Sequence, residues 1–200
     1  MPITIGAKRE SDFTDPIGML GDCHRRMERF LNVLVRVAAQ ENGGPLTEQH
    51  KTALGTSLRY FREAAPKHTA DEEESLFPRL RRSGHAAAQE MLARIDSLEQ
   101  DHESARKAHD EVNELGEHWL TRGLLSPAEA SRLTAVLDQL LRLYQRHIAI
   151  EDTEIFPIAA TVLSLSDRDS VGAEMAARRR IDDFPHRRRS FGGADPLGRT

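Results

Sequence analysis

Apolar positions recur in steps of three and four along most of this chain, which is the spacing of one face of an α-helix. The first such stripe follows Asp15-Pro16, a capping residue with proline at the first helical position. The Asn42-Gly43-Gly44-Pro45 turn ends this predicted helix, and Thr47 can cap the next one. The stripe consists of Ile17, Leu20, His24, Met27, Leu31, Leu34 and Ala38.

Three further stripes follow, and each of them also contains histidine. The second consists of Leu54, Leu58, Phe61, Ala65, His68 and Glu72, and Pro66 predicts a kink just before His68. After a break at Ser83-Gly84, the third consists of Ile95, Leu98, His102, Ala105, His109, Val112 and Trp119. The fourth follows a capping box, Ser126-Pro127-Ala128-Glu129, and consists of Leu133, Leu137, Leu140, Tyr144, His147 and Glu151.

Four long amphipathic helices with short connections, and no convincing strand pattern, predict an all-α fold. We expect an antiparallel, up-down-up-down four-helix bundle over residues 15–163. Residues 164–200 are predicted to form a polar, arginine-rich and partly disordered tail, with one short helix near Ser170–Arg180. Its arginine runs, 178–180 and 187–189, are expected to be solvated, and the segment from Phe191 is expected to be disordered.

Composition narrows the classes of protein to be considered. With 200 residues and a formal charge of −4, the chain suits a single soluble domain and lacks the positive charge of a nucleic-acid-binding protein. No apolar run approaches the about 20 residues of a membrane span, and no signal peptide is recognisable at the N-terminus. The single cysteine, Cys23, fits a reducing cytoplasm and is expected to be a small packed residue rather than a ligand. We therefore expect a cytoplasmic protein that binds neither nucleic acid nor membranes; composition leaves the oligomeric state open.

An internal repeat organises the histidines. Residues 67–78 read KHTADEEESLFP and residues 146–157 read RHIAIEDTEIFP, and in both copies the Phe-Pro pair predicts that the helical run stops. Each half of the chain is therefore a helical hairpin with one histidine on its first helix and His-x-x-x-Glu on its second. At a fixed offset of 79 positions, the repeat pairs His68 with His147, Glu72 with Glu151, Phe77 with Phe156, and Pro78 with Pro157. His24 and His102 are 78 positions apart.

Six polar residues lie on these apolar stripes and are predicted to point into the core. Burying four imidazoles and two carboxylates together is costly unless something compensates them, and metal ions are the simplest compensation. Two glutamates that bridge two ions would give each ion four protein donors, and a solvent-derived oxo or hydroxo bridge would give a fifth. This leaves room for an exogenous ligand and suits iron, although the ligand types also admit zinc or manganese. The six predicted ligands are His24, His68, Glu72, His102, His147 and Glu151.

The other acidic residues and histidines are assigned structural roles. His109 would lie about 10 Å along its helix from His102, too far to share an ion, so we expect a core or supporting residue. The acids Asp71, Glu73, Glu74 and Glu154 are expected to form a solvated face. His50, His85, His118 and His186 are expected to lie on the surface.

The six-residue set resembles the ligand set of the hemerythrin-like (HHE cation-binding) family, over about residues 15–160. The resemblance implies a four-helix bundle that holds two iron ions in a non-haem di-iron centre, with both glutamates bridging. It also implies oxygen, nitric oxide, peroxide or iron itself as the molecule handled. Compared with oxygen-carrying hemerythrins, Arg106 replaces the second histidine of a His-x-x-x-His pair. Those carriers also use His-x-x-x-x-Asp, which Asp152 would satisfy, whereas the repeat favours Glu151.

Other functions remain to be weighed. Ferritin-like di-iron enzymes use Glu-x-x-His on two helices, but this chain has one such match, Glu99-x-x-His102. A His-Asp phosphohydrolase could be built around His109-Asp110 but would leave the repeat unexplained. Within the di-iron interpretation, the centre either reacts with oxygen, nitric oxide or peroxide, with oxidoreductase-type activity, or only holds or senses iron. The symmetric ligand set is similar to those of iron–sulfur-cluster repair proteins and iron-sensing domains, and the sequence does not separate these alternatives.

Overall fold

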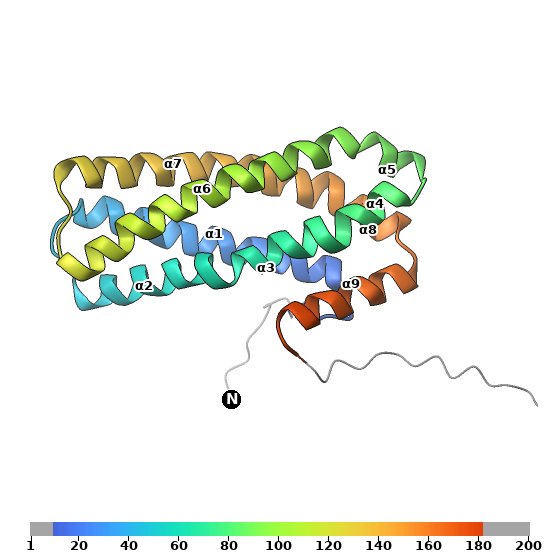
Figure 1. The fold of residues 1–200 in the computed structure, drawn as a ribbon, viewed down its shortest axis with the longest axis horizontal. Helices are drawn as coiled ribbons and strands as arrows, with labels where there is room; N and C mark the ends of the chain where they lie inside the picture. The colour runs from blue at the N-terminus through green and yellow to red at the C-terminus, as the bar shows by residue number, and fades with distance from the viewer. Residues whose placement is uncertain (1–9, 182–200) are drawn as a thin grey trace, which may run out of the picture.

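Four helical rods, arranged as an antiparallel bundle, make up most of the molecule (Figure 1). A computed structural model describes residues 10–181, and this part of the chain contains no strand. The first rod is α1 (Pro16–Glu41). The second consists of α2 (Glu48–Glu63), α3 (Ala65–Ala70), the π-helical turn η1 (Asp71–Leu76) and α4 (Phe77–Arg82). The third consists of α5 (Ala86–Glu90) and α6 (Leu92–Arg122), and the fourth of α7 (Pro127–Ile150), the π-helical turn η2 (Glu151–Ile155) and α8 (Phe156–Val162).

Several helix ends lie where the capping residues predict them. The Asp15 carboxylate accepts a hydrogen bond from the backbone N–H of Gly18, and Asn42 ends α1 in the left-handed conformation. Ser126 and Glu129 form the predicted capping box of α7. The break between α2 and α3 at Ala64 confirms the interruption predicted from Pro66. Capping residues and apolar periodicity, both readable in the sequence, therefore specify the all-α bundle.

A layer of polar residues divides the bundle core into two apolar clusters. α1 packs on α2 and α7, and α6 packs on the same two helices, so the four rods enclose one interior. Along α1, His24 lies between Leu20 of one cluster and Met27 of the other. Along α6, His102 likewise lies between Leu98 and Ala105. The histidines therefore occupy one level of the bundle, with apolar packing on both sides.

The Phe-Pro pairs do not stop the helices, and the prediction that they do is wrong. Instead, a wider π turn precedes each pair, and the N–H groups of Phe77 and Phe156 bond to the carbonyls of Glu72 and Glu151, five residues back. The following proline has no N–H and would collide with the carbonyl four residues before it in a regular α-helix. The π turn removes that conflict, and such turns frequently occur at functional sites.

A short helix after the bundle, α9 (Leu165–Arg178), lies along its outside and contacts α1 and η1 (Figure 1). Val171 and Met175 are fully buried in one of the two core clusters. The helix approaches the segment before α1 so closely that a Cβ at Gly172 would lie 2.0 Å from the Phe13 carbonyl oxygen. The short helix predicted near Ser170 is therefore present and packed, and it begins at Leu165.

Two predictions about charged residues are wrong, and one contact explains both. Asp71 is fully buried rather than solvated, and the arginines at 178 and 179 are not free in solvent. Arg178 Nη1 lies 3.0 Å from Asp71 Oδ1, and Arg179 Nη2 lies 2.6 Å from Asp71 Oδ2. The carboxylate can be buried because two guanidinium groups, at the end of α9 and just after it, neutralise its charge.

Some predictions lie outside the described residues. These concern the arginine run 187–189, the segment from Phe191, and His186. None of the helices in residues 10–181 combines the length and apolar character that a membrane span requires.

The Asp71 contact generates a stability prediction. We expect Asp71→Ala to lower the free energy of unfolding by about 2–3 kcal/mol, because it removes the buried acidic partner that two largely buried arginines share. Glu74→Ala is the matched control, since Glu74 also pairs with Arg178 but its side chain is 66% exposed. The control should cost less than about 1 kcal/mol. Urea unfolding monitored by circular dichroism measures both, and equal losses would contradict a special role for the buried carboxylate.

Candidate metal centre

Two overlapping groups of buried donors lie in the polar layer. One consists of His24, His68, Glu72 and Glu151, and the other of Glu72, His102, His147 and Glu151. Within each group, the potential ligand atoms lie within 4.8 Å of one another. The two glutamates belong to both groups. The structure thus brings together all six residues that the sequence singles out, in an arrangement consistent with a binuclear metal site.

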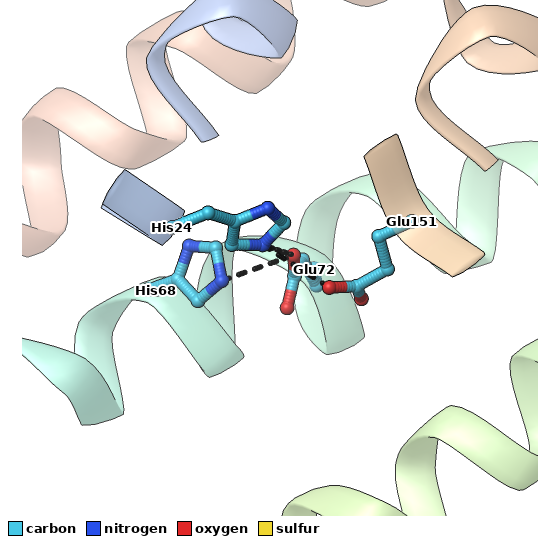
Figure 2. Close-up of side chains that lie close together, drawn as sticks. All are labelled: His24, His68, Glu72 and Glu151. Carbon is cyan, nitrogen blue, oxygen red and sulfur yellow. Dashed lines mark ion pairs between the residues drawn. The ribbon is translucent and has the colours of Figure 1, made fainter. Parts of the chain in front are cut away.

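The first group combines side chains from α1, α3 and the two π turns (Figure 2). His24 Nε2 lies 3.1 Å from Glu151 Oε2 and 3.9 Å from Glu72 Oε1. His68 Nε2 lies 3.2 Å from the same Glu72 oxygen. Because His68 and Glu72 are four residues apart, both side chains project from one face of the second rod.

The second group mirrors the first, with side chains from α6 and α7. His102 Nε2 lies 3.3 Å from Glu72 Oε2, and His147 Nε2 lies 3.1 Å from Glu151 Oε2. The Nε2 atoms of the two histidines are 3.1 Å apart. Glu72 therefore faces His24 and His68 with Oε1 and His102 with Oε2. Glu151 faces His24 and His147 with the same oxygen, Oε2.

Five of these atoms are buried without a hydrogen-bond partner among the described residues. They are Nε2 of His24 and all four carboxylate oxygens of Glu72 and Glu151. The ion-pair distances above place them near each other, but not in hydrogen-bonding geometry. Unpartnered buried polar atoms are rare in folded proteins because each costs a large part of its solvation energy. Their common direction, into one small space, fits bound cations.

Two further carboxylates accept hydrogen bonds from the Nδ1 atoms of two of the histidines. His24 Nδ1 donates to Asp152 Oδ1 at 2.8 Å, and His102 Nδ1 donates to Glu73 Oε1 at 2.8 Å. A carboxylate accepts only, so these bonds place the ring proton on Nδ1 and leave Nε2 free to bind a cation. Asp152 therefore lies on the far side of His24 from the donor groups.

The prediction of a solvated acidic face is incomplete for Glu73, which contacts His102 while its side chain stays 37% exposed. The sequence analysis did not predict that Glu73 and Asp152 would each hydrogen-bond to a histidine of the cluster. The signal that could have found it is the repeat itself, because Glu73 and Asp152 are also 79 positions apart. Of the other acids on that face, Glu74 is exposed as expected, and Glu154 is one-third exposed and pairs with Arg94.

The buried carboxylates and imidazoles of the cluster shift one another's pKa values. Burial acts to lower the pKa of His24, but Asp152 and Glu151 outweigh it and raise this pKa to about 10. Burial is likewise outweighed at His102, where Glu72 and Glu73 raise the pKa to about 10. By contrast, burial together with neighbouring His24 lowers the pKa of His68.

The pKa values of the two shared carboxylates, Glu72 and Glu151, are shifted in opposite directions. Burial and the nearby Glu151 charge raise the pKa of Glu72 to about 7. Burial would also raise the pKa of Glu151, but His147 and His24 outweigh it and lower that pKa below its usual range. Like charges in one apolar site cannot both be ionised without compensation.

The residues of the competing interpretations lie elsewhere. Glu99 pairs with Arg81 at 2.7 Å and belongs to neither donor group. Asp110 is 72% exposed and faces Arg106, whose own side chain is 61% exposed and supplies no donor to the cluster. Cys23 is buried and accepts a hydrogen bond from Arg26, as expected of a packed residue.

The remaining histidines are not part of the donor groups either. His50 pairs with Glu41 and His118 with Glu129, each with about one-quarter of its side chain exposed. His85 caps α5. They are thus surface or half-buried residues with structural partners.

A cavity of about 730 Å³ lies beside the cluster, and all four imidazoles contribute to its lining. His109 and Tyr144 also line it, with His109 Nε2 2.9 Å from the Tyr144 hydroxyl. Phe61 stacks on the His109 ring at a centroid distance of 4.2 Å, and burial lowers the pKa of His109 to about 4. His109 is therefore a neutral, packed side chain at neutral pH, outside both donor groups.

Comparison with known proteins gives two findings. A family model described as Hemerythrin HHE cation binding domain matches residues 15–159. A protein of Haemophilus influenzae (strain ATCC 51907 / DSM 11121 / KW20 / Rd), described as uncharacterized, is 29% identical over 171 residues. This similarity covers 86% of the present chain and 94% of the other protein.

The first prediction from the site separates two adjacent acids. Glu151→Ala should lose at least one bound ion, because Glu151 belongs to both donor groups. Asp152→Ala should retain both ions with affinity weakened about 10- to 100-fold, because it loses only the carboxylate behind His24. Metal content after desalting, measured by mass spectrometry, and chelator competition test this. The reverse order of effects would show that Asp152, and not Glu151, is the ligand.

The second prediction concerns pH. His24 and His102, one in each donor group, keep a proton up to about pH 10 in the metal-free chain, and a bound cation must displace it. Metal affinity should therefore rise as pH increases from 7 to 9, by about tenfold per pH unit for each ion, and fall on acidification. Competition with a chelator of known pH dependence measures the slope. An affinity that does not change over this range would contradict histidine ligation.

Proposed function

The chain belongs to the hemerythrin HHE cation-binding domain family, and from this premise we propose that it holds a non-haem di-iron centre that binds or reacts with oxygen, nitric oxide or peroxide. The observation that carries the proposal is the pair of buried donor groups sharing Glu72 and Glu151. In this proposal the ligands are the two glutamates together with His24, His68, His102 and His147.

The donor set favours iron. Two imidazoles and two shared carboxylates per ion suit a metal of intermediate softness and leave coordination positions for small molecules. When bound, iron would supply one-electron redox chemistry at these positions. Thiolates, which select softer metals and structural zinc, play no part in either donor group.

The surrounding residues would prepare the centre for this role. Asp152 and Glu73 orient the imidazoles of His24 and His102 and strengthen them as donors. The two apolar clusters on either side limit access by water. The cavity beside the imidazoles gives small molecules a path to the cluster.

This path favours a reactive centre over a module that only holds or senses iron. An iron-holding site needs the six donors and an entry path for the ion, but it does not need a cavity of about 730 Å³. The cavity is the specific observation behind our preference, and the iron-holding function is the alternative.

The test combines metal analysis with rapid mixing. Protein expressed in iron-rich medium should contain about two iron atoms per chain, and one zinc atom per chain would contradict the di-iron proposal. After anaerobic reduction, stopped-flow optical spectra should change on mixing with nitric oxide. Oxygen should oxidise the centre in a reaction that removal of the gas does not reverse.

Two variants sharpen the result. His147→Ala should lose iron and both responses, whereas His50→Ala, which changes a half-buried histidine outside the donor groups, should behave like the unmodified protein. Two bound irons with no response to either gas would support the iron-holding alternative. Fully reversible oxygen binding would instead indicate an oxygen carrier.

A further inference from the structure

The cavity beside the cluster is larger than the ligands considered so far require. Its volume of about 730 Å³ falls within the range of about 300–1,000 Å³ that is typical of pockets for organic ligands. Oxygen, nitric oxide and hydrogen peroxide would each fill only a small part of it. The space therefore points to a bulkier molecule.

The walls of the cavity are mainly apolar. They come from α1, α2 and α6, and Figure 1 shows α6 running obliquely past α2 and α3. An apolar surface of this kind gains free energy when it covers the hydrocarbon part of a ligand. The apolar lining includes Met27, Leu34, Leu58, Phe61 and Val112.

His109 and Tyr144 give this apolar space one polar anchor. The neutral imidazole and the phenol carry two polar protons, and the hydrogen bond between them uses one. If the phenol donates to Nε2, the Nδ1 proton of His109 remains; if Nε2 donates, the hydroxyl proton of Tyr144 remains. Either way, the pair retains one donor for an acceptor oxygen on a ligand. Stacking of Phe61 on His109 holds the pair in place.

The rim of the cavity does not favour an anionic ligand. Its two arginines already have acidic partners: Arg62 Nη1 lies 3.0 Å from Glu117, and Arg106 Nη2 lies 2.8 Å from Glu103. Arg106 also lies 3.5 Å from Asp110. The remaining acidic and basic side chains at this outer rim are carboxylates, so a carboxylate or phosphate entering the cavity would be repelled there.

We propose that this cavity binds an uncharged organic molecule with one hydroxyl-type end, an alcohol or an organic hydroperoxide. Its hydrocarbon body lies against the apolar walls, and its oxygen accepts a hydrogen bond from the N–H or O–H group that the His109–Tyr144 pair retains. The inference rests on the proposed function in one respect, since a hydroperoxide in the cavity would lie beside the imidazoles of the proposed iron centre. Binding itself requires only the residues of the cavity.

The probe for this proposal is 2-phenylpropan-2-ol, an alcohol without an O–O bond. Isothermal titration calorimetry of the full chain should show saturable binding with one site per chain. Ala105→Phe, which fills part of the cavity, should abolish binding while thermal unfolding shows a folded protein. Thr69→Trp, at a half-buried lining position, is a second blocking variant if Ala105→Phe does not fold. Absence of saturable binding, or binding that a folded blocking variant leaves unchanged, would overturn the proposal.

Conservative variants test the anchor. His109→Phe and Tyr144→Phe should each weaken binding about five- to tenfold, the effect of losing one hydrogen bond. Tyr60→Phe is the matched control, because this half-buried tyrosine does not line the cavity and its hydroxyl lies 3.5 Å from the Cys23 carbonyl oxygen. It should leave the affinity unchanged. Equal affinities for all three variants would show that the anchor is wrong.

Failure of this proposal and failure of the proposed function give different results. Iron content and the nitric oxide response are measured on the same preparations. Binding of the alcohol without iron or without a gas response would contradict the proposed function and support the cavity assignment. Two irons with a gas response, but no alcohol binding, would contradict the cavity assignment and leave the proposed function standing.

Discussion

Burial of two carboxylates among four imidazoles is the constraint on which the rest of the structure depends. Their inward-facing atoms include five without hydrogen-bond partners among the described residues, and no apolar packing could compensate them. Only cations or protons can, and the pKa values of His24 and His102 are raised by their carboxylate neighbours, in the direction that this compensation requires. The same requirement divides the hydrophobic core into two clusters, because the polar layer must extend across all four rods.

The two helical hairpins of the repeat place their buried glutamates and histidines in the same way. Each half places a glutamate at the start of a π turn, with a Phe-Pro pair after it. Each half also places a carboxylate behind one histidine, Glu73 behind His102 and Asp152 behind His24. One of the two π turns also contacts the outer helix. Asp71, next to Glu72, is buried against Arg178 at the end of α9 and against Arg179, which follows it. The position of this π turn is thus coupled to packing outside the bundle.

The cavity provides space for a ligand beside the donor groups. It connects the imidazoles with the surface between the second and third rods, through apolar walls that contain the His109–Tyr144 pair. The arrangement combines a layer of buried donor groups with a cavity beside it, and this combination is the basis of the reactive centre that we propose.

Local signals in the sequence determined the bundle and the six inward-facing residues. Capping residues and apolar periodicity act over a few turns of helix, and the 79-residue offset is a repeat along the sequence itself. All three can therefore be read without coordinates. Only the tertiary structure decided the partners of these residues. It buried Asp71 against two arginines a hundred positions away, set Asp152 behind His24, and opened the cavity at His109. These features depend on how side chains from separate helices meet in space, and no periodicity along one helix encodes that meeting.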